Sequence, residues 1–105
     1  MAPADDPVLT RFRAALERAY GRDLERAVLY GSRARGEAGR ESDYDVAVFL
    51  KGVGGFGRQA QTLADIETEI LLETGAVINA LPLKAGSHRA RTGLMGEIRR
   101  DGRDL

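Results

Sequence analysis

Two short apolar runs joined through a Gly-Ser dipeptide constrain the fold more than any other feature of this chain. The runs are residues 26–30 (RAVLY) and 44–50 (YDVAVFL), and both are short and partly β-branched, which predicts buried strands. Because Gly31 has no Cβ, it allows a sharp turn directly after the first strand. Ser32 is a favourable N-cap, so we expect a short helix from this position through Arg35.

Two acidic side chains, Asp43 and Asp45, lie one residue apart where the second predicted strand begins. Side chains two positions apart on a strand point to the same face, so both carboxylates are expected on one side of the sheet. Two like charges this close repel each other unless a hard cation with oxygen ligands lies between them. The helix start at Gly31 and Ser32 offers free N–H groups to an anion. Together these features predict a site for a metal-bound nucleoside triphosphate.

The same residues resemble a family signature. Gly31-Ser32, ten further residues and then Asp43-Tyr44-Asp45 are similar to the GS-x10-DxD pattern of the DNA polymerase β-like nucleotidyltransferase superfamily. The short chain and its GSRARG and SDYD segments most resemble the minimal nucleotidyltransferases of that superfamily. Those proteins are often encoded as antitoxins beside a HEPN-domain ribonuclease toxin, and some inactivate the toxin by moving AMP from ATP onto a tyrosine.

The resemblance implies a role for each motif residue. Gly31 and Ser32 would bind the β- and γ-phosphates of ATP through backbone N–H groups and the serine hydroxyl. Asp43 and Asp45 would be the catalytic carboxylates and would coordinate Mg²⁺, with Asp45 able to bridge two ions. The acceptor of the nucleotide would be a hydroxyl on a protein or a small molecule.

Arg33 and Arg35 flank the Gly-Ser turn and are further candidates for nucleotide binding. The chain contains fourteen arginines and two lysines, and arginine binds phosphate through a planar fork of donors. For most of these arginines, codon bias in a GC-rich genome is a better explanation than phosphate binding. Only the two that border the turn are therefore candidates for contact with phosphate or the acceptor.

Active members of the superfamily generally carry a third carboxylate on the next strand, and the matching position in residues 76–83 (AVINALPL) is Asn79. An amide oxygen can ligate Mg²⁺, but it is neutral and a poor base. Asn79 is therefore either a weaker third metal ligand in a slow enzyme or the mark of a site that binds ATP without turnover. Glu73 is an alternative carboxylate, although a solvated helix position is the simpler expectation for it.

The rest of the chain predicts an alternation of helices and strands. Apolar residues recur at helical spacing in three segments, and a third strand is expected at residues 76–83, with Pro82 at its exposed or terminal end. The three helices are expected at residues 7–20, 58–74 and 92–100. We therefore expect an α/β fold with a small mixed three-stranded sheet covered by helices, which is the fold that the resemblance implies. Residues 1–105 are expected to form one domain.

Some side-chain environments follow from the same spacing. The second long helix is expected to turn four apolar residues inward: Leu63, Ile66, Ile70 and Leu71. Residues 99–105 (RRDGRDL) are expected to be a solvated helix end, and the single histidine, His88, is expected at the surface. Tyr30 and Tyr44 border the motif and are interpreted as packing residues.

Composition restricts the function further. The formal net charge is zero, so no global basic field favours direct binding of nucleic acid. Without cysteine, the chain has neither a disulfide framework nor a cysteine zinc site. The N-terminal MAPADDPV has no apolar signal segment, and no later run approaches membrane-spanning length, so we expect a cytoplasmic protein that does not bind membranes.

A second glycine motif competes with this interpretation. Residues 52–57 (GVGGFG) match G-x-G-x-x-G between a predicted strand and a predicted helix, which is the context of dinucleotide binding. However, the next strand runs into Lys84 rather than an acidic residue for the ribose, and 105 residues are too few for the required βα units. A flexible connector is the preferred interpretation.

Three functions therefore remain. The first is a Mg²⁺-dependent transferase that moves a nucleotide, AMP from ATP, to a hydroxyl of a HEPN-domain partner, as the antitoxin of such a pair. The second is a nucleotide-binding module that neutralises a HEPN-type partner by contact without catalysis. The third, an aminoglycoside-type transferase, is less favoured because such enzymes usually need a second domain to hold their substrate.

Overall fold

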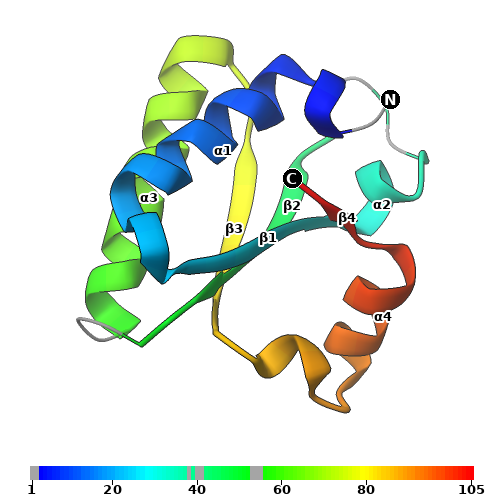
Figure 1. Ribbon diagram of the computed structural model, residues 1–105. Coiled ribbons are helices and arrows are strands. Elements are labelled where there is room, and N and C mark those ends of the chain that lie inside the picture. The colour runs from blue at the N-terminus through cyan, green and yellow to red at the C-terminus, as the bar shows by residue number, and fades with distance from the viewer. Residues whose placement is uncertain (1–2, 38, 40–41, 53–55) are drawn as a thin grey trace.

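A mixed four-stranded sheet with helices on both faces organises this protein (Figure 1). The computed structural model describes residues 3–37, 39, 42–52 and 56–105. Its helices and strands are α1 (Pro7–Tyr20), β1 (Leu24–Tyr30), α2 (Gly31–Ala34), β2 (Tyr44–Leu50), α3 (Phe56–Thr74), β3 (Ile78–Lys84), α4 (Gly93–Asp101) and β4 (Arg103–Asp104). Short 3₁₀ turns occur at Pro3–Asp5, Gly21–Asp23 and Ser87–Arg89.

The strands lie in the order β3-β2-β1-β4. β1 runs antiparallel to both β2 and β4, whereas β3 runs parallel to β2. A parallel pair needs a long crossover connection, and α3 supplies it. The predicted mixed α/β sheet is confirmed, and the bounds of β2 are those expected from its apolar run.

The fourth strand departs from the prediction of three strands and of a solvated helix end at residues 99–105. α4 ends where the Gly102 N–H donates to the Ile98 carbonyl over 2.8 Å. The chain then turns back along β1 at close range, because a Cβ on Gly102 would overlap both Ile98 and the side chain of Val28. The absence of one side chain therefore allows a polar tail to form a short edge strand.

Local capping fixes the ends of the helices. The Asp6 side chain accepts hydrogen bonds from the N–H groups of Val8 at 2.9 Å and Leu9 at 3.5 Å, and so begins α1. Thr92 begins α4 in the same way, with its hydroxyl oxygen accepting from the Met95 N–H at 3.1 Å. The three long helices predicted from sequence spacing are all present.

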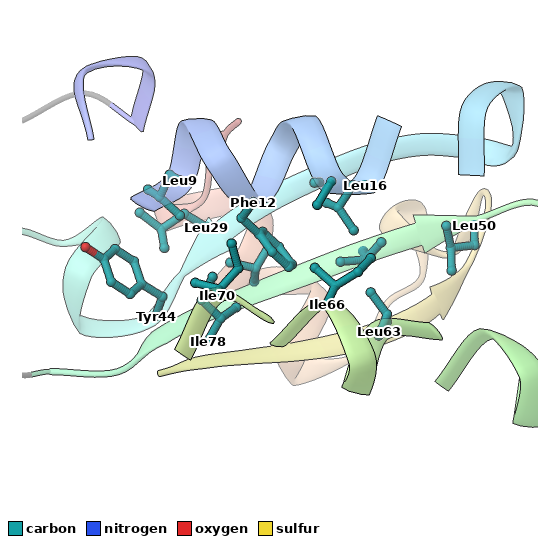
Figure 2. Packing of buried hydrophobic residues seen from close by; sticks show 14 of the residues in the cluster. Leu9, Phe12, Leu16, Leu29, Tyr44, Leu50, Leu63, Ile66, Ile70 and Ile78 are labelled. Carbon is teal, nitrogen blue, oxygen red and sulfur yellow. The ribbon is translucent and has the colours of Figure 1, made fainter. Parts of the chain in front are cut away.

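The helices α1 and α3 pack side by side on one face of the sheet and close the main core (Figure 1; Figure 2). The side chain of Phe12 points from α1 into the centre of this cluster and is fully buried. Its labelled neighbours in Figure 2 are Leu9, Leu16, Leu29, Tyr44, Leu50, Leu63, Ile66, Ile70 and Ile78. Leu71 is instead 45% exposed, so the prediction that it faces inward is wrong. Leu71 lies about 100° around the helix from the buried Ile70, so its side chain leaves the stripe that faces the sheet.

The opposite face of the sheet is only partly covered, by α4. The smaller cluster there consists of Val28, Ala47, Phe49, Met95 and Ile98. At the end of the sheet next to α2 the face stays open to solvent: Asp43 and Asn79 are exposed, and Asp45 is half-buried. The architecture thus leaves polar side chains accessible at one corner of an otherwise apolar sheet.

β3 forms one edge of the sheet. Pro82 lies within this strand rather than at its end, opposite Val48 of β2. A proline lacks an N–H donor and is tolerated in a strand where that donor would face outward. Two residues earlier in the strand, a backbone hydrogen bond from Ala80 reaches the Glu67 carboxyl of α3. Burial raises the pKa of Glu67, and this hydrogen bond opposes the rise.

Candidate functional site

The turn from β1 into α2 borders the site. We call the solvent-accessible end of the sheet with Asp43, Asp45 and Asn79 the open corner. Gly31 is buried and adopts a φ of +73°, a conformation that favours glycine. A Cβ on Gly31 would lie 2.6 Å from Oδ2 of Asp45, well inside contact distance. Both constraints require glycine here, and the second one is specific to the site, because the missing side chain makes room for a carboxylate.

The N-cap of α2 lies two residues earlier than the sequence indicates. Ser32 is predicted as the N-cap, but the cap position belongs to Tyr30, and Ser32 lies within the first turn. Gly31 itself provides the first carbonyl of the turn, which accepts from the Arg35 N–H at 3.2 Å, and Ser32 accepts from the Glu37 N–H at 2.9 Å. The predicted contacts of Gly31 and Ser32 with phosphate remain a prediction.

Asp43, Asp45 and Asn79 come together at the open corner. The Asn79 amide nitrogen donates to Oδ2 of Asp43 at 3.1 Å and to Oδ1 of Asp45 at 3.4 Å. Asp45 and Asn79 are direct partners in the parallel β2–β3 register, so the sheet itself fixes their separation. The proximity expected of these three residues is present, whereas their roles as metal ligands remain predictions.

Tyr30 lies beside the same carboxylates. It is the partner of Asp45 in the antiparallel β1–β2 register and is half-buried. Burial raises the pKa of the Tyr30 hydroxyl, and the negative charges of Asp45 and Glu97 raise it further. The phenol therefore stays neutral at physiological pH. The placement of Glu97, on α4, was not among the sequence-predicted features, because no spacing rule links it to β2.

Arg33 lies on the other side of the sheet from Asp45. Its guanidinium stacks over the ring of Tyr44, 3.8 Å from the ring centre, and its Nε donates to the Ser42 carbonyl at 2.8 Å. The Tyr44 hydroxyl donates to Asp6 at 2.8 Å, and burial followed by this hydrogen bond raises the pKa of Tyr44. Tyr44 is buried in the main core, in agreement with its interpretation as a packing residue.

The Arg33 side chain borders a hollow of about 440 Å³ beneath α1 and the start of β3. Its lining comprises Val8, Arg33, Ser42, Tyr44, Thr74, Gly75, Ala76 and Val77. Neither Asp43 nor Asp45 contributes to this lining. The structure therefore separates Arg33 from the carboxylate pair, and contact of Arg33 with phosphate stays a prediction that needs its side chain to move.

Arg35 is held by two acidic groups at the other end of α2. Its Nε pairs with Glu37 at 3.1 Å and its Nη1 with Glu97 at 3.2 Å. Together with Arg100 and Arg103 it borders a second hollow of about 310 Å³. Arg35 is thus paired with Glu97, the α4 carboxylate whose charge also acts on Tyr30 beside Asp45.

The donor set of the open corner fits a hard divalent cation only in part. Two carboxylates and one amide oxygen are oxygen donors of the kind that Mg²⁺ prefers, and Mg²⁺ is usually bound by one or two carboxylates together with substrate phosphates. Within the described parts of the chain, no group of three or more His, Cys, Asp or Glu side chains is placed to hold a metal ion. The residues therefore fit a cation that arrives with additional ligands.

The remaining sequence candidates lie elsewhere. Glu73 forms an ion pair with Arg11 of α1, on the face opposite Asp45, so it does not supply the third carboxylate. His88, predicted at the surface, is partly exposed: its Nδ1 accepts from Arg26 at 3.1 Å, and its ring meets Phe49 edge-on. Part of the GVGGFG motif, residues 53–55, lies outside the described residues. None of the helices in the described regions is long and apolar enough to cross a membrane.

Comparison with known proteins adds an independent observation. The family profile described as "Polymerase beta, Nucleotidyltransferase" matches residues 16–104 of the chain. Two solved structures share the fold. A crystal structure of a toxin–antitoxin with AMP-PNP has a TM-score of 0.64 at 19% identity, and the similarity covers 90% of this chain and 69% of that one.

The second similar structure is that of a mutant of the toxin–antitoxin MntA-HpeT. Its TM-score is 0.63 at 17% identity, with 90% of this chain and 69% of that chain covered. No curated protein matches the sequence significantly. At these identities the similarity concerns the fold, and the family profile carries the assignment of the sequence.

Proposed function

The chain belongs to the polymerase beta nucleotidyltransferase family, and from this premise we propose that it binds ATP with Mg²⁺ and transfers AMP to a hydroxyl of a partner protein. The observation that carries the proposal is the convergence of Asp43, Asp45 and Asn79 beside the Gly31 turn. No other described corner of the molecule combines two carboxylates, an amide and a glycine that leaves space next to them.

Each residue has a part in the proposed reaction. Asp43 and Asp45 hold Mg²⁺ through carboxylate oxygens, and Asn79 can add its amide oxygen. Mg²⁺ held there would supply positive charge to the triphosphate while the acceptor hydroxyl displaces pyrophosphate from the α-phosphorus. Gly31 and Ser32 lie at the turn next to Asp45, where their backbone N–H groups can meet the leaving phosphates. Arg33 and Arg35 remain the two arginine candidates for a contact with phosphate or the acceptor.

We further propose that the chain acts as an antitoxin. Two solved structures that share its fold are of toxin–antitoxin proteins, one of them with AMP-PNP, and the sequence motif resembles that of antitoxins paired with HEPN-domain toxins. In this proposal the acceptor hydroxyl belongs to a HEPN-type partner. The chain then works as one domain, residues 1–105, in the cytoplasm.

A second function is favoured by one observation, the identity of residue 79. A neutral amide cannot accept a proton from the acceptor hydroxyl, and in this structure the Asn79 nitrogen is already hydrogen-bonded to both carboxylates. Glu73 does not take over that role, because it is paired with Arg11 on the other face of the sheet. The alternative is therefore a protein that binds Mg²⁺ and ATP and neutralises its partner by contact, without transfer.

Calorimetric titration with ATP in the presence and absence of Mg²⁺ tests the shared part of both proposals. We expect saturable binding that requires Mg²⁺ and is weakened at least about 10–100-fold by Asp45→Asn, the range found when even an outer partner of a metal ligand is lost. Asp65→Asn is the matched control, because Asp65 is an exposed residue of α3, far from the open corner. If Asp45→Asn binds ATP with Mg²⁺ as tightly as the native chain, the assignment of the site to Asp45 is wrong.

Transfer is tested separately with ATP labelled at the α-phosphate and a purified HEPN-type partner. Label on the partner supports the transferase, and its loss with Asp43→Asn shows that the assigned carboxylates are responsible. Mg²⁺-dependent binding with no label on the partner, but with inhibition of the partner on mixing, supports the contact-only module instead.

A further inference from the structure

The Asn79 amide occupies the hydrogen-bonding positions that a cation at this site would need. Its nitrogen donates one hydrogen to Oδ2 of Asp43 at 3.1 Å and the other to Oδ1 of Asp45 at 3.4 Å. A primary amide has two N–H donors, so both are used here. The neighbours also fix the orientation, because turning the amide around would point its oxygen at two negative charges.

This amide can turn without disturbing the fold. The backbone of Asn79 is held by the register with Asp45, but the side chain is exposed and the terminal torsion of an asparagine has a broad, two-fold preference. The oxygen and the nitrogen of the amide can therefore exchange places by rotation about one bond. The cost is the loss of two hydrogen bonds to charged groups.

The two orientations have opposite chemical properties. With the nitrogen inward, the amide satisfies Asp43 and Asp45 and reduces their mutual repulsion without any metal. With the oxygen inward, it repels the two carboxylates unless a cation lies among the three groups, in which case it becomes a third oxygen ligand. A cation shared by the carboxylates must therefore displace the nitrogen from the same oxygen atoms.

We propose that Asn79 is a two-position switch that keeps this site free of metal until Mg²⁺ arrives together with the nucleotide. The inference rests on the proposed function, because the phosphates must supply the ligands that two carboxylates and a neutral amide lack. Free divalent cations then bind weakly, since two hydrogen bonds oppose them. The nucleotide complex binds with rotation of the Asn79 amide from donor to ligand.

Nuclear magnetic resonance can observe this rotation directly. Asn79 is the only asparagine in the chain, and Gln59 and Gln61 are the only glutamines, so three side-chain amide signals are expected. Amide protons bound to carboxylates resonate downfield, and we expect the Asn79 pair to lose that shift on addition of Mg²⁺ with ATP. Mg²⁺ alone should leave it in place, and the two glutamine signals serve as internal controls. A signal of Asn79 that does not move when calorimetry shows binding of Mg²⁺ and ATP overturns the switch.

Titration with Mn²⁺ alone, without nucleotide, tests the same inference independently of ATP. Asn79→Asp replaces the amide by a third charged ligand, and we expect it to bind free Mn²⁺ at least about tenfold more tightly than the native chain, because affinity rises with ligand charge. Asn79→Ala removes both the blocking donor and the ligand. It should bind free Mn²⁺ no more weakly than the native chain but bind Mg²⁺ with ATP more weakly.

These results separate the two levels of the proposal. Absence of ATP binding in every variant contradicts the proposed function, while the Mn²⁺ titration still decides the role of Asn79. Equal affinity of the native chain and Asn79→Asp for Mn²⁺ overturns the switch even if ATP binds. A thermal melt of each variant without metal confirms that the compared proteins are folded.

Discussion

The two faces of the sheet differ in what they bury and what they leave open. On the face under α1 and α3, fifteen of the described residues are buried in one continuous cluster. On the face under α4, five are, and beyond them the polar corner with Asp43, Asp45 and Asn79 meets solvent. A single strand serves both faces: Tyr44, Val46, Val48 and Leu50 of β2 point one way, and Asp45, Ala47 and Phe49 the other.

This division shows how a chain of only 105 residues can expose a charged site and still bury a core. Most of the stabilising burial lies on the face that carries Tyr44 and Arg33 but none of the three polar residues Asp43, Asp45 and Asn79. The opposite face can then expose carboxylates without opening the main core. Since strand side chains alternate, the separation needs no additional structure. We expect substitutions on the two faces to have separable effects on stability and on nucleotide binding.

The largest expected effect is the loss of stability on the closed face. Phe12→Ala removes a fully buried ring from the centre of the main core and should lower the free energy of unfolding by about 3–5 kcal/mol. Urea denaturation followed by circular dichroism measures this change. At temperatures where the variant is folded, its affinity for Mg²⁺ with ATP should equal that of the native chain.

Leu72→Ala on the outer side of α3 is the control for this substitution. Leu72 is 81% exposed, so its removal should change stability by no more than about 0.5 kcal/mol. A Phe12→Ala protein that is as stable as Leu72→Ala, or that is folded but no longer binds ATP, would break the division between the faces.

A smaller effect on stability, but a large one on the site, is expected at the turn between the faces. Gly31→Ala forces a left-handed φ on a residue with a Cβ, at a cost of about 1–3 kcal/mol, and pushes against the Asp45 carboxylate. Calorimetry should show an affinity for Mg²⁺ with ATP at least about tenfold lower, equivalent to 1.4 kcal/mol.

Gly86→Ala separates backbone strain from the carboxylate contact. Gly86 also has a positive φ, of 88°, but a Cβ there meets nothing within 4 Å. It should cost about 1–2 kcal/mol of stability and leave binding of Mg²⁺ with ATP unchanged. Equal losses of binding in both glycine variants would mean that Asp45 does not need the space beside Gly31.

The smallest expected effect is a pH dependence on the α4 face. Burial, and then the positive charges of Arg26 and Arg99, lower the pKa of His88 below its ordinary value of 6.5. As the pH falls, His88 is protonated in the unfolded chain before it is protonated in the folded chain. The contribution of His88 to stability is therefore constant above about pH 6.5 and is lost as the pH falls toward its folded pKa. Thermal melts from pH 7.5 to pH 5 should therefore show the native chain losing stability relative to His88→Gln, while a constant difference would contradict the assigned environment.

Much of this fold follows from sequence pattern. The β2 bounds and the three long helices are predicted because their apolar spacing is long and regular, and Asp6 and Thr92 are recognisable caps. β4 has no such signal: two polar residues form it, and only the close approach of Gly102 to Val28 makes it possible. The inward direction of Leu71 is wrong because helical spacing does not specify how wide the partner surface is.

The candidate site shows the same limit. The proximity of Asp43 and Asp45 follows from the two-residue period of a strand, and the place of Asn79 follows from the order of strands that the family resemblance implies. The direction of the Arg33 side chain does not follow from the sequence, because its stacking on Tyr44 depends on how α2 meets the sheet. The bonds of the Asn79 amide to both carboxylates depend on the exact register of β2 and β3, which no pattern within one strand contains.

The edge formed by β3 has a consequence for how the protein can associate. An unpaired strand edge is a template on which another chain can continue the sheet and start a polymer. Here Pro82 offers no donor, and the backbone of Ala80 is already bonded to Glu67. A second molecule that approaches this edge finds part of the ladder missing, so growth of a shared sheet is discouraged and binding has to use side-chain surfaces. The β3 edge is therefore a poor starting point for a fibril.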